Sequence, residues 1–213
     1  MPDPAKRSDW ELYDAWRNGD NAAGDVLLVR YFEILTRYFY TKVRVEDVGD
    51  LVSETFLACV TGIDRELTSG SFKALLFGIA MNKTRQYYRK RDKRRRESDD
   101  YNAVCAADSG LVTPVGLLAK RDEVRLLVRA LQRLPLRQQT ILELSHFEGL
   151  TGPEIAELVG APLATVYSLL RRGKLRLAEL VRELSDSPEL AESTLMGIET
   201  WALQVRAQLA PAA

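Results

Sequence analysis

The sequence predicts an all-α protein made of two helical domains joined by a flexible linker, the second domain ending in a helix-turn-helix. Hydrophobic residues recur at helical spacing along nearly the whole chain, and no segment sustains the alternation of a strand. A polar segment without a regular period, residues 97–113, reads as the linker. We therefore expect domains over 9–96 and 114–184, followed by an amphipathic C-terminal extension over 185–213.

Four helices are predicted in the first domain. Apolar residues over 9–40 follow helical spacing, and the polar run RNGDN at 17–21 divides them into two helices. A third helix is expected over 45–60, with a loop starting at Thr61. The fourth helix begins near Ser71, whose hydroxyl suits an N-cap, and becomes strongly basic toward its end.

The second domain closes on a sequence typical of a short helix, a tight turn and a longer helix. Thr151 and Glu154 have the spacing of a capping box, in which each side chain satisfies a backbone amide. Gly160 suits a left-handed turn, and the next helix starts at Pro162. Its polar and cationic outer face favours a helix-turn-helix whose second helix enters the major groove of DNA. A solvated helix on an ordinary bundle is the alternative.

Charge is segregated along the chain, although 30 Lys and Arg residues balance 30 Asp and Glu residues. The stretch from Lys83 to Arg96 contains nine Lys and Arg residues opposed only by Asp92, and an acidic segment over 46–54 precedes it. One chain with a cationic and an anionic surface would suit two different partners.

Several other function classes find little support. No segment is long and apolar enough to cross a bilayer, and the first ten residues lack the apolar core of a signal peptide. We therefore expect a cytoplasmic protein without membrane insertion. Cys59 and Cys105 have no ligand spacing around them, and His146 is expected to pack or cap a helix. Without a nucleophile motif or a phosphate-binding glycine loop, we expect no enzyme, no cofactor and no metal.

Two motifs in the right order resemble the extracytoplasmic-function (ECF) sigma factors of bacterial RNA polymerase. Region 4 of that family is similar to LPLRQQTILELSHFEGLTGPEIAELVGAPLATVYSLLRRGKLRL. Their clamp-binding helix resembles VEDVGDLVSETF, and their promoter-melting helix resembles GSFKALLFGIAMNKTRQYYRKRDKRR. The resemblance covers about residues 27–183. It implies a protein that binds core RNA polymerase and promoter DNA, as duplex and as melted non-template strand, and promotes transcription initiation.

The resemblance also implies a polymerase-binding face on the third helix. Asp47, Asp50 and Glu54 match the family's acidic motif and would face the polymerase clamp. Leu51 and Phe56 would support that helix from the core or touch the clamp directly. A solvated acidic helix face is the alternative, but the basic element that follows at family spacing favours the clamp.

For the downstream promoter element, the family holds an unstacked non-template base between a loop and the following helix. Residues 61–70 match that loop, and Asn82 matches the asparagine that hydrogen-bonds the base. Tyr87 and Tyr88 would stack on bases, or at least one of them would belong to the core. The residues expected to contact the downstream element are Asn82, Lys83, Arg85, Gln86, Arg89 and Arg91.

In region 4, the residues expected at or beside the positions that read the upstream element are Thr165, Tyr167, Ser168, Arg171, Arg172 and Lys174. The chain also departs from the family. Leu75 replaces a common tryptophan, and Gly173 is expected to interrupt the helix. Ala161 and Pro162 replace the usual polar cap before the recognition helix. We therefore expect weaker upstream binding than usual and a base preference that no relative supplies.

Three functions stay open on the sequence: an ECF sigma factor, a two-domain helix-turn-helix regulator of duplex DNA, and a sigma-like protein that sequesters a partner. Binding to core polymerase without DNA separates the first two, and promoter opening separates the first from the third. The family is often held by an anti-sigma protein, which would be a further partner. The apolar stripe of the extension is expected to dock on region 4 rather than on a partner helix or a second chain.

Overall fold

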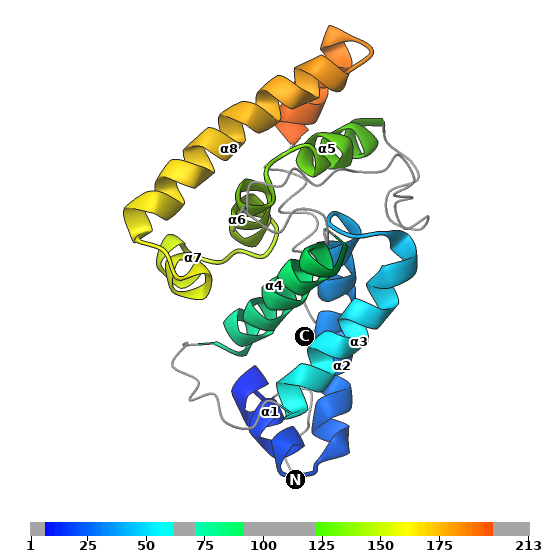
Figure 1. Ribbon diagram of the computed structural model, residues 1–213, viewed down its shortest axis with the longest axis vertical. Helices are drawn as coiled ribbons and strands as arrows, with labels where there is room; N and C mark the ends of the chain where they lie inside the picture. The colour runs from blue at the N-terminus through cyan, green and yellow to red at the C-terminus, as the bar shows by residue number, and fades with distance from the viewer. Residues whose placement is uncertain (1–6, 62–70, 92–121, 198–213) are drawn as a thin grey trace.

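The structure is a computed structural model that describes residues 7–61, 71–91 and 122–197. Over these residues the regular secondary structure is helical, without strands, which confirms the predicted all-α class. The predicted linker at 97–113 lies outside the described residues. Figure 1 shows the helices in two stacked groups, an N-terminal half made of α1 to α4 and a C-terminal half that begins with α5.

The N-terminal half follows the predicted helices closely. Its helices are α1 (Asp9–Arg17), α2 (Asn21–Tyr40), α3 (Val45–Thr61) and α4 (Phe72–Arg91). The ring of Phe72, at the start of α4, lies 5.2 Å from the ring centroids of both Tyr13 and Tyr31. Because aromatic rings bury large apolar areas, this cluster fixes the start of α4 against α1 and α2.

The C-terminal half consists of α5 (Asp122–Gln132), α6 (Leu136–His146), α7 (Gly152–Val159), α8 (Leu163–Leu184) and a further helical stretch over 188–197. That last stretch is the start of the predicted extension, and it packs within the chain. Ala191 and Thr194 are buried, and the hydroxyl of Ser193 donates a 2.9 Å hydrogen bond to Glu123 on α5. Over these residues the extension docks on the second domain, as expected, whereas 198–213 lie outside the described residues.

Helix α8 runs unbroken from Leu163 to Leu184, so the expectation that Gly173 interrupts it is wrong. Gly173 is buried, and a Cβ atom there would lie 3.0 Å from Cδ1 of Leu142 on α6. The missing side chain lets α8 approach α6, and this packing outweighs the low helix propensity of glycine.

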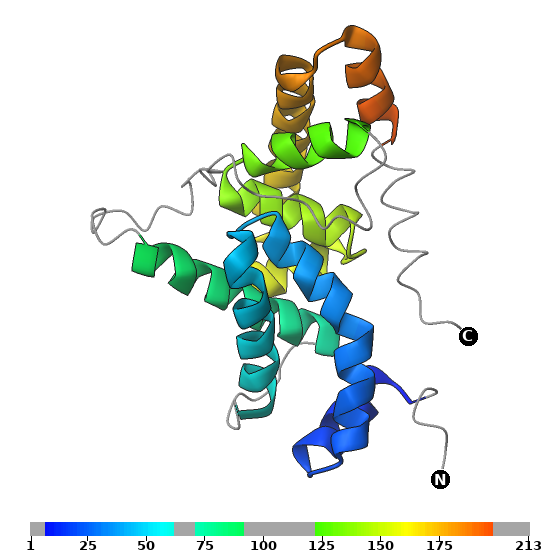
Figure 2. The same ribbon diagram turned by 90° about the vertical axis from the view of Figure 1, so that its right-hand side faces the viewer.

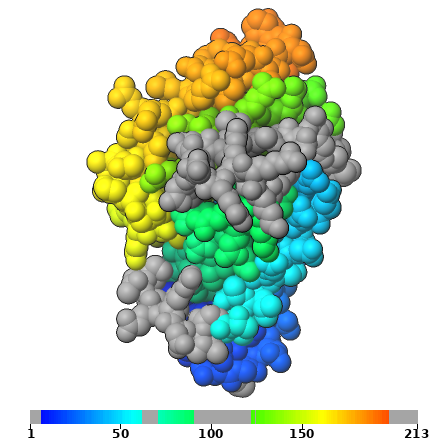
Figure 3. Space-filling model, in the orientation of Figure 1, coloured from blue at the N-terminus to red at the C-terminus, as the bar shows by residue number. Residues whose placement is uncertain are grey.

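The two halves pack directly against one another. Helix α7 lies between α4 and α8 and contacts both (Figure 1). A single hydrophobic cluster includes Phe77 of α4 together with Ile141 of α6 and Ile155 of α7. The view in Figure 2 shows the C-terminal half stacked on α2 and α4 along the long axis, and the surfaces of α7 and α4 meet in Figure 3. The described residues therefore form one packed arrangement of two helical units.

Candidate protein and nucleic-acid interfaces

The outer face of α3 carries acidic side chains and one exposed leucine. Asp50 and Glu54 are exposed, and Leu57 is 63% exposed. Residues spaced three or four apart share one side of a helix, so these three side chains form a continuous face. Asp47 is half-buried near the start of α3 and accepts a 2.8 Å hydrogen bond from the hydroxyl of Tyr87. The predicted acidic motif is thus presented on one face, except that Asp47 is partly engaged by α4.

Leu51 and Phe56 lie beneath this face. Both are buried in the hydrophobic cluster that extends across both halves. Their burial favours the interpretation in which they support α3 from the core over the one in which they touch a partner directly. Leu57 was not among the predicted site residues, although its spacing from Asp50 and Glu54 is a signal that could have identified it.

A cavity of about 500 Å³ lies between α1, α3 and α4. Its polar lining contains all the predicted downstream-element residues except Arg91, namely Asn82, Lys83, Arg85, Gln86 and Arg89. Tyr13, Leu75 and Ile79 contribute apolar surface, and Thr61 of the predicted loop reaches it from the end of α3. Arg91 is the last residue of α4, and its side chain lies outside the described part of the structure, as does the rest of the loop.

Hydrogen bonds position the polar groups of this cavity. Nη1 of Arg85 donates a 3.0 Å bond to Oδ1 of Asn82, which orients the side-chain amide. Nζ of Lys83 donates a 2.8 Å bond to Oε2 of Glu54 on α3. This bond lowers the pKa of the Glu54 carboxyl below its ordinary value. The cationic wall of the cavity is therefore tied to the acidic face of α3.

The cavity also borders a buried thiol. Cys59 lies in the core of the N-terminal half, and burial raises its pKa to about 12. The hydroxyl of Tyr13 donates a 2.9 Å hydrogen bond to the backbone carbonyl of Cys59. Because the thiol stays protonated at neutral pH, it contributes apolar surface and not a nucleophile.

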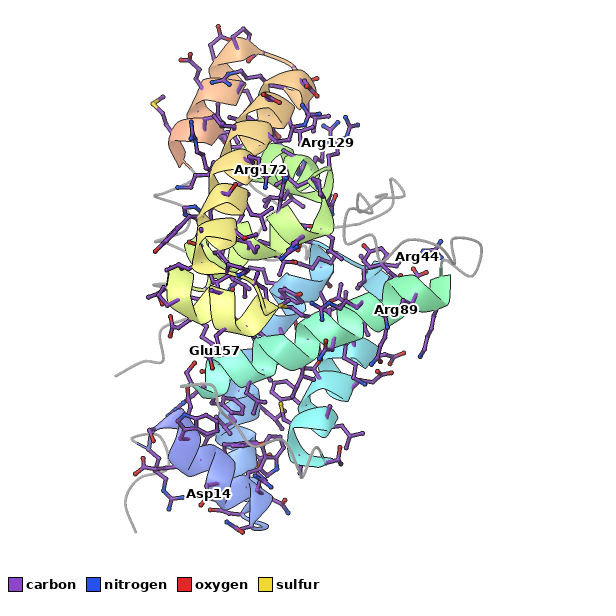
Figure 4. The ribbon with its side chains drawn as sticks, turned by 60° about the vertical axis from the view of Figure 1, so that its left-hand side comes forward. Asp14, Arg44, Arg89, Arg129, Glu157 and Arg172 are labelled. Atoms are coloured by element: carbon purple, nitrogen blue, oxygen red, sulfur yellow. The ribbon has the colours of Figure 1, made fainter. Side chains whose placement is uncertain are left out.

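The paired tyrosines of α4 are both engaged within the protein. The hydroxyl of Tyr87 bonds to Asp47, and that of Tyr88 donates to the backbone carbonyl of Lys42. Their rings meet edge to face at 5.5 Å. These contacts favour the interpretation in which they belong to the packing of α4. Figure 4 shows Arg89 and Arg44 toward the same end of the N-terminal half, and the Arg44 amide donates to the Tyr87 hydroxyl at 3.5 Å.

The predicted helix-turn-helix is formed by α7 and α8. The Thr151 amide donates to Glu154 Oε2 at 2.7 Å and the Glu154 amide to Thr151 Oγ1 at 3.4 Å, which confirms the capping box. Gly160 ends α7 with φ +61°, the left-handed conformation that favours glycine. Pro162 occupies the N-cap position of α8 and makes no side-chain cap hydrogen bond, because proline has no polar side-chain atom.

The outward face of α8 carries the residues predicted to read the upstream element. Thr165 is half-buried, and the exposed members are Tyr167, Ser168, Arg171, Arg172 and Lys174. Val166 and Leu169 point inward and are buried. Arg172 stands on α8 in Figure 4, away from the end of α4 that bears Arg89. The two candidate DNA-contacting surfaces therefore lie in different halves.

Tyr167 also packs on the start of α7. A Cβ atom on Gly152 would lie 2.8 Å from the Tyr167 hydroxyl oxygen, which is tighter than normal contact. The tyrosine ring therefore lies across the N-terminus of α7, where only glycine leaves room for it. The position of Tyr167 on the candidate reading face depends on this contact.

Two further properties concern the described residues only. They contain no group of three or more His, Cys, Asp or Glu side chains arranged to hold a metal ion. None of the described helices has the length and apolar character needed to span a membrane.

Comparisons with known proteins agree with this arrangement. A family model for sigma-70 region 4 matches residues 125–177, which contain the helix-turn-helix. The ECF RNA polymerase sigma-E factors of Escherichia coli K12 and Salmonella typhimurium LT2 are each 27% identical over 184 residues, covering 83% of this chain and 96% of the relative. The Haemophilus influenzae sigma-E factor is 27% identical over 188 residues, covering 83% of this chain and 97% of the relative.

Two solved structures share the fold. CnrH in complex with the cytosolic domain of CnrY has a TM-score of 0.61 at 23% identity, covering 84% of this chain and 100% of that chain. The sigma factor RpoE of Bartonella quintana, in complex with the anti-sigma factor NepR, has a TM-score of 0.56 at 23% identity, covering 76% of this chain and 97% of that chain. With the region 4 match and relatives that extend along most of the sequence, these findings show that the chain is similar to the ECF RNA polymerase sigma factors over most of its length.

Proposed function

We propose that this protein is a dissociable specificity subunit of bacterial RNA polymerase. It binds core polymerase, recognises two promoter elements with its two halves, and promotes opening of the downstream one. The observation that carries the proposal is the cavity between α1, α3 and α4. This cavity is lined by Asn82 and its polar and cationic neighbours on α4, and Lys83 joins it to the acidic face of α3.

The cavity supplies the groups that would hold an unpaired non-template base. The Asn82 amide can accept from and donate to a base edge, and Arg85 orients it. Tyr13 and Leu75 offer apolar surface to the base. Capture of a flipped base offsets the unpairing cost of about a few kcal/mol. Binding therefore drives strand opening in this proposal, and the chain needs no catalytic group of its own.

The cations beside the cavity would follow the DNA backbone. Arg89 lines the cavity toward the C-terminal end of α4, one turn beyond Arg85. Phosphates attract such side chains without regard to sequence, and each neutralised phosphate releases counterions. The proposal thus predicts downstream binding that weakens strongly as salt concentration rises.

The acidic face of α3 is the proposed contact with the polymerase clamp. Asp50 and Glu54 would provide charge complementarity, which speeds association and fixes orientation. Leu57, exposed beside them, would be the apolar anchor of that interface. The buried Leu51 keeps the helix in register on the core beneath.

The outward face of α8 is the proposed reader of the upstream element. Arg171 and Arg172 can each donate two hydrogen bonds to a guanine edge or bind a phosphate. Ser168 can donate to a base edge or to a phosphate. Tyr167, held against Gly152, would set the depth to which α8 enters the groove. The protein would act in the cytoplasm, where the polymerase is. An anti-sigma protein is a further proposed partner, since RpoE of Bartonella quintana is bound to one.

The test is in-vitro transcription with purified core polymerase on a library of upstream regions, with permanganate footprinting of unpaired thymines. We expect discrete start sites with local melting. Asn82→Ala should abolish melting while leaving polymerase binding intact, and Asp50→Arg should weaken polymerase binding. Matched controls are Asn18→Ala, at the exposed C-cap that follows α1, and Asp25→Arg, an exposed change on α2.

Three results distinguish the alternatives. Polymerase binding without opening of any library member would replace the proposal with a sequestering protein. DNA binding without polymerase binding would replace it with a free-standing regulator. Equal losses in Asn82→Ala and Asn18→Ala would remove the cavity as the site of base capture.

A further inference from the structure

The α4 wall of the cavity between α1, α3 and α4 is rich in hydrogen-bond donors. Lys83, Arg85 and Arg89 carry cationic groups, which donate hydrogen bonds and accept none. Asn82 and Gln86 are the amides of the same wall, and an amide can present either a donor or an acceptor. What this wall offers to a bound base therefore depends on how its amides are turned.

The amide of Asn82 is turned by Arg85. Nη1 of Arg85 donates a 3.0 Å hydrogen bond to Oδ1 of Asn82, three positions earlier on the same side of α4. The guanidinium has no acceptor, so the opposite orientation of the amide would set two donors against one another. Nδ2 of Asn82 therefore points away from Arg85, and among the described residues it has no hydrogen-bond partner.

The neighbours of Asn82 leave the choice of base to it. Nζ of Lys83 is directed to Glu54, and Arg89 is exposed one turn beyond Arg85. Gln86 is exposed as well, so its amide can turn to suit a ligand and imposes no preference. Asn82 is half-buried and held by Arg85, which makes its amide the fixed polar group of the wall.

Much of the remaining cavity surface is apolar. Tyr13 of α1, Ala58 of α3 and Leu75 of α4 line it, and the Tyr13 hydroxyl already donates to the backbone carbonyl of Cys59. A base has two apolar faces and a polar edge, so its faces suit this surface. A captured base would therefore turn its hydrogen-bonding edge toward the donors of α4.

The four bases differ in what such an edge offers. Guanine presents O6 beside N7, and cytosine presents O2 beside N3, so each has two adjacent acceptors. Adenine places its N6 amino donor beside N7 and N1, and thymine places its N3 donor between O2 and O4. A donor wall therefore matches cytosine and guanine better than adenine and thymine.

The bond from Arg85 also blocks the usual way in which asparagine reads adenine. In that contact the side-chain oxygen accepts from N6 while the nitrogen donates to N7. Here Oδ1 of Asn82 already accepts from Arg85, and its second lone pair lies beside a guanidinium that repels the partly positive amino group of adenine. Adenine would thus lose half of its normal contact.

We propose that Arg85 is a positioning residue that makes Asn82 a donor toward the captured base, and that this base has two adjacent acceptors, as cytosine and guanine do. The inference deepens the proposed function and rests on it. Base choice at this position is then set by the pair of Asn82 and Arg85, and not by Asn82 alone.

The experiment uses holoenzyme assembled from core polymerase and the full chain. The promoter library locates the downstream element, and comparison with Asn82→Ala identifies the position whose base preference depends on Asn82. Single-stranded non-template oligonucleotides with each of the four bases at that position are then titrated by fluorescence anisotropy. Cytosine or guanine should bind at least about fivefold more tightly than adenine and thymine.

Two base analogues test recognition through acceptors. Inosine lacks the amino group of guanine, and pyrimidin-2-one lacks that of cytosine, but each keeps the two adjacent acceptors of its parent base. The analogue of the preferred base should bind with the affinity of that base. The two analogues also distinguish a guanine site from a cytosine site.

Three variants isolate the role of Arg85. Arg85→Ala releases the Asn82 amide, so the ratio of affinities between the preferred base and adenine should fall toward one. Arg85→Lys keeps a donor beside Oδ1 and should keep the preference. Arg89→Ala removes another cation of the same wall and should weaken all four oligonucleotides by the same factor.

The outcomes separate the inference from the proposed function. Equal weakening of all four oligonucleotides by Arg85→Ala would mean that Arg85 serves only the DNA backbone, and would overturn the inference. A wild-type preference for adenine or thymine, or a loss of affinity with the amino-free analogue, would overturn it as well. Holoenzyme that binds none of the oligonucleotides would overturn the proposed function, and the inference with it.

Discussion

Nζ of Lys83 on α4 lies 2.8 Å from Oε2 of Glu54 on α3, so a residue of the proposed DNA site is paired with a residue of the proposed polymerase face. Neither can make its full contact with an outside partner while this pair is intact. A cationic surface that takes Glu54 would release Lys83 toward DNA. We therefore expect this one ion pair to couple the two proposed bindings.

Glu54→Gln should strengthen binding of single-stranded non-template DNA by the free protein. The pair is partly exposed, and such pairs contribute roughly 0–1 kcal/mol, so the gain should be at most about fivefold. Anisotropy titrations of a labelled oligonucleotide at two salt concentrations measure it. Glu179→Gln, an exposed acid that pairs with Arg176 on α8, is the control. An equal gain in both variants would attribute the effect to net charge rather than to Lys83.

Leu57→Ser should weaken binding to core polymerase without destabilising the fold. Leu57 is 63% exposed, so its removal leaves no cavity, while truncation of an interface anchor costs about 2 kcal/mol or more. Competition binding to core polymerase and thermal unfolding measure the two effects. Val29→Ser, at the 80% exposed valine of α2, should change neither polymerase binding nor thermal unfolding.

Leu51→Ala should instead lower the free energy of unfolding by roughly 2–5 kcal/mol, because Leu51 is buried.

Local pattern predicts much of this molecule. Leu51 and Phe56 fall on the inner side of α3 because burial follows the helical repeat, which the sequence displays directly. Thr151, Glu154 and Gly160 are equally readable, since capping and turning involve residues only a few positions apart. The cavity residues on α4 could be found only through family resemblance, because their gathering depends on how α1, α3 and α4 pack.

Contacts between distant residues escape such reasoning. Lys42 and Glu143 are 101 positions apart, and an isolated charge in a sequence is normally solvated. Only the packing of the halves makes them a buried pair. Gly173 illustrates the same limit, since its low helix propensity predicts a break, whereas close approach to Leu142 requires the glycine within a continuous helix.

Gly152→Ala should weaken upstream-element binding through Tyr167. The added methyl would lie 2.8 Å from the Tyr167 hydroxyl oxygen, so the ring must move from its place on α8. We expect affinity for an upstream duplex to fall by about tenfold, which is comparable to the loss of one base contact. Gly49→Ala, where a Cβ atom would meet nothing within 4 Å, is the control for the substitution itself. If Gly152→Ala with Tyr167→Ala binds more weakly than Tyr167→Ala alone, the effect does not pass through the tyrosine.

The capping box of α7 gives the helix-turn-helix a defined response to acid. The Thr151 hydroxyl, then its backbone amide, lowers the pKa of Glu154 below the ordinary value of 4.5. A carboxyl whose pKa is lower in the folded state stabilises the fold above its unfolded pKa. That stabilisation begins to decrease as pH falls below about 4.5, and it is lost completely only below the lower pKa of the folded state.

Glu154→Gln should therefore destabilise the protein at neutral pH and approach the stability of wild type in strong acid. Thr151→Ala should cost about 0.5–2 kcal/mol at neutral pH, because it removes the cap that both groups share. Urea unfolding at pH values on both sides of 4.5 measures the difference for each variant. Glu157→Gln, an exposed change on the same helix (Figure 4), has no cap to lose and should show no such pH dependence. A Glu157→Gln profile that matches that of Glu154→Gln would mean that the charge of α7, and not the capping box, sets the acid response.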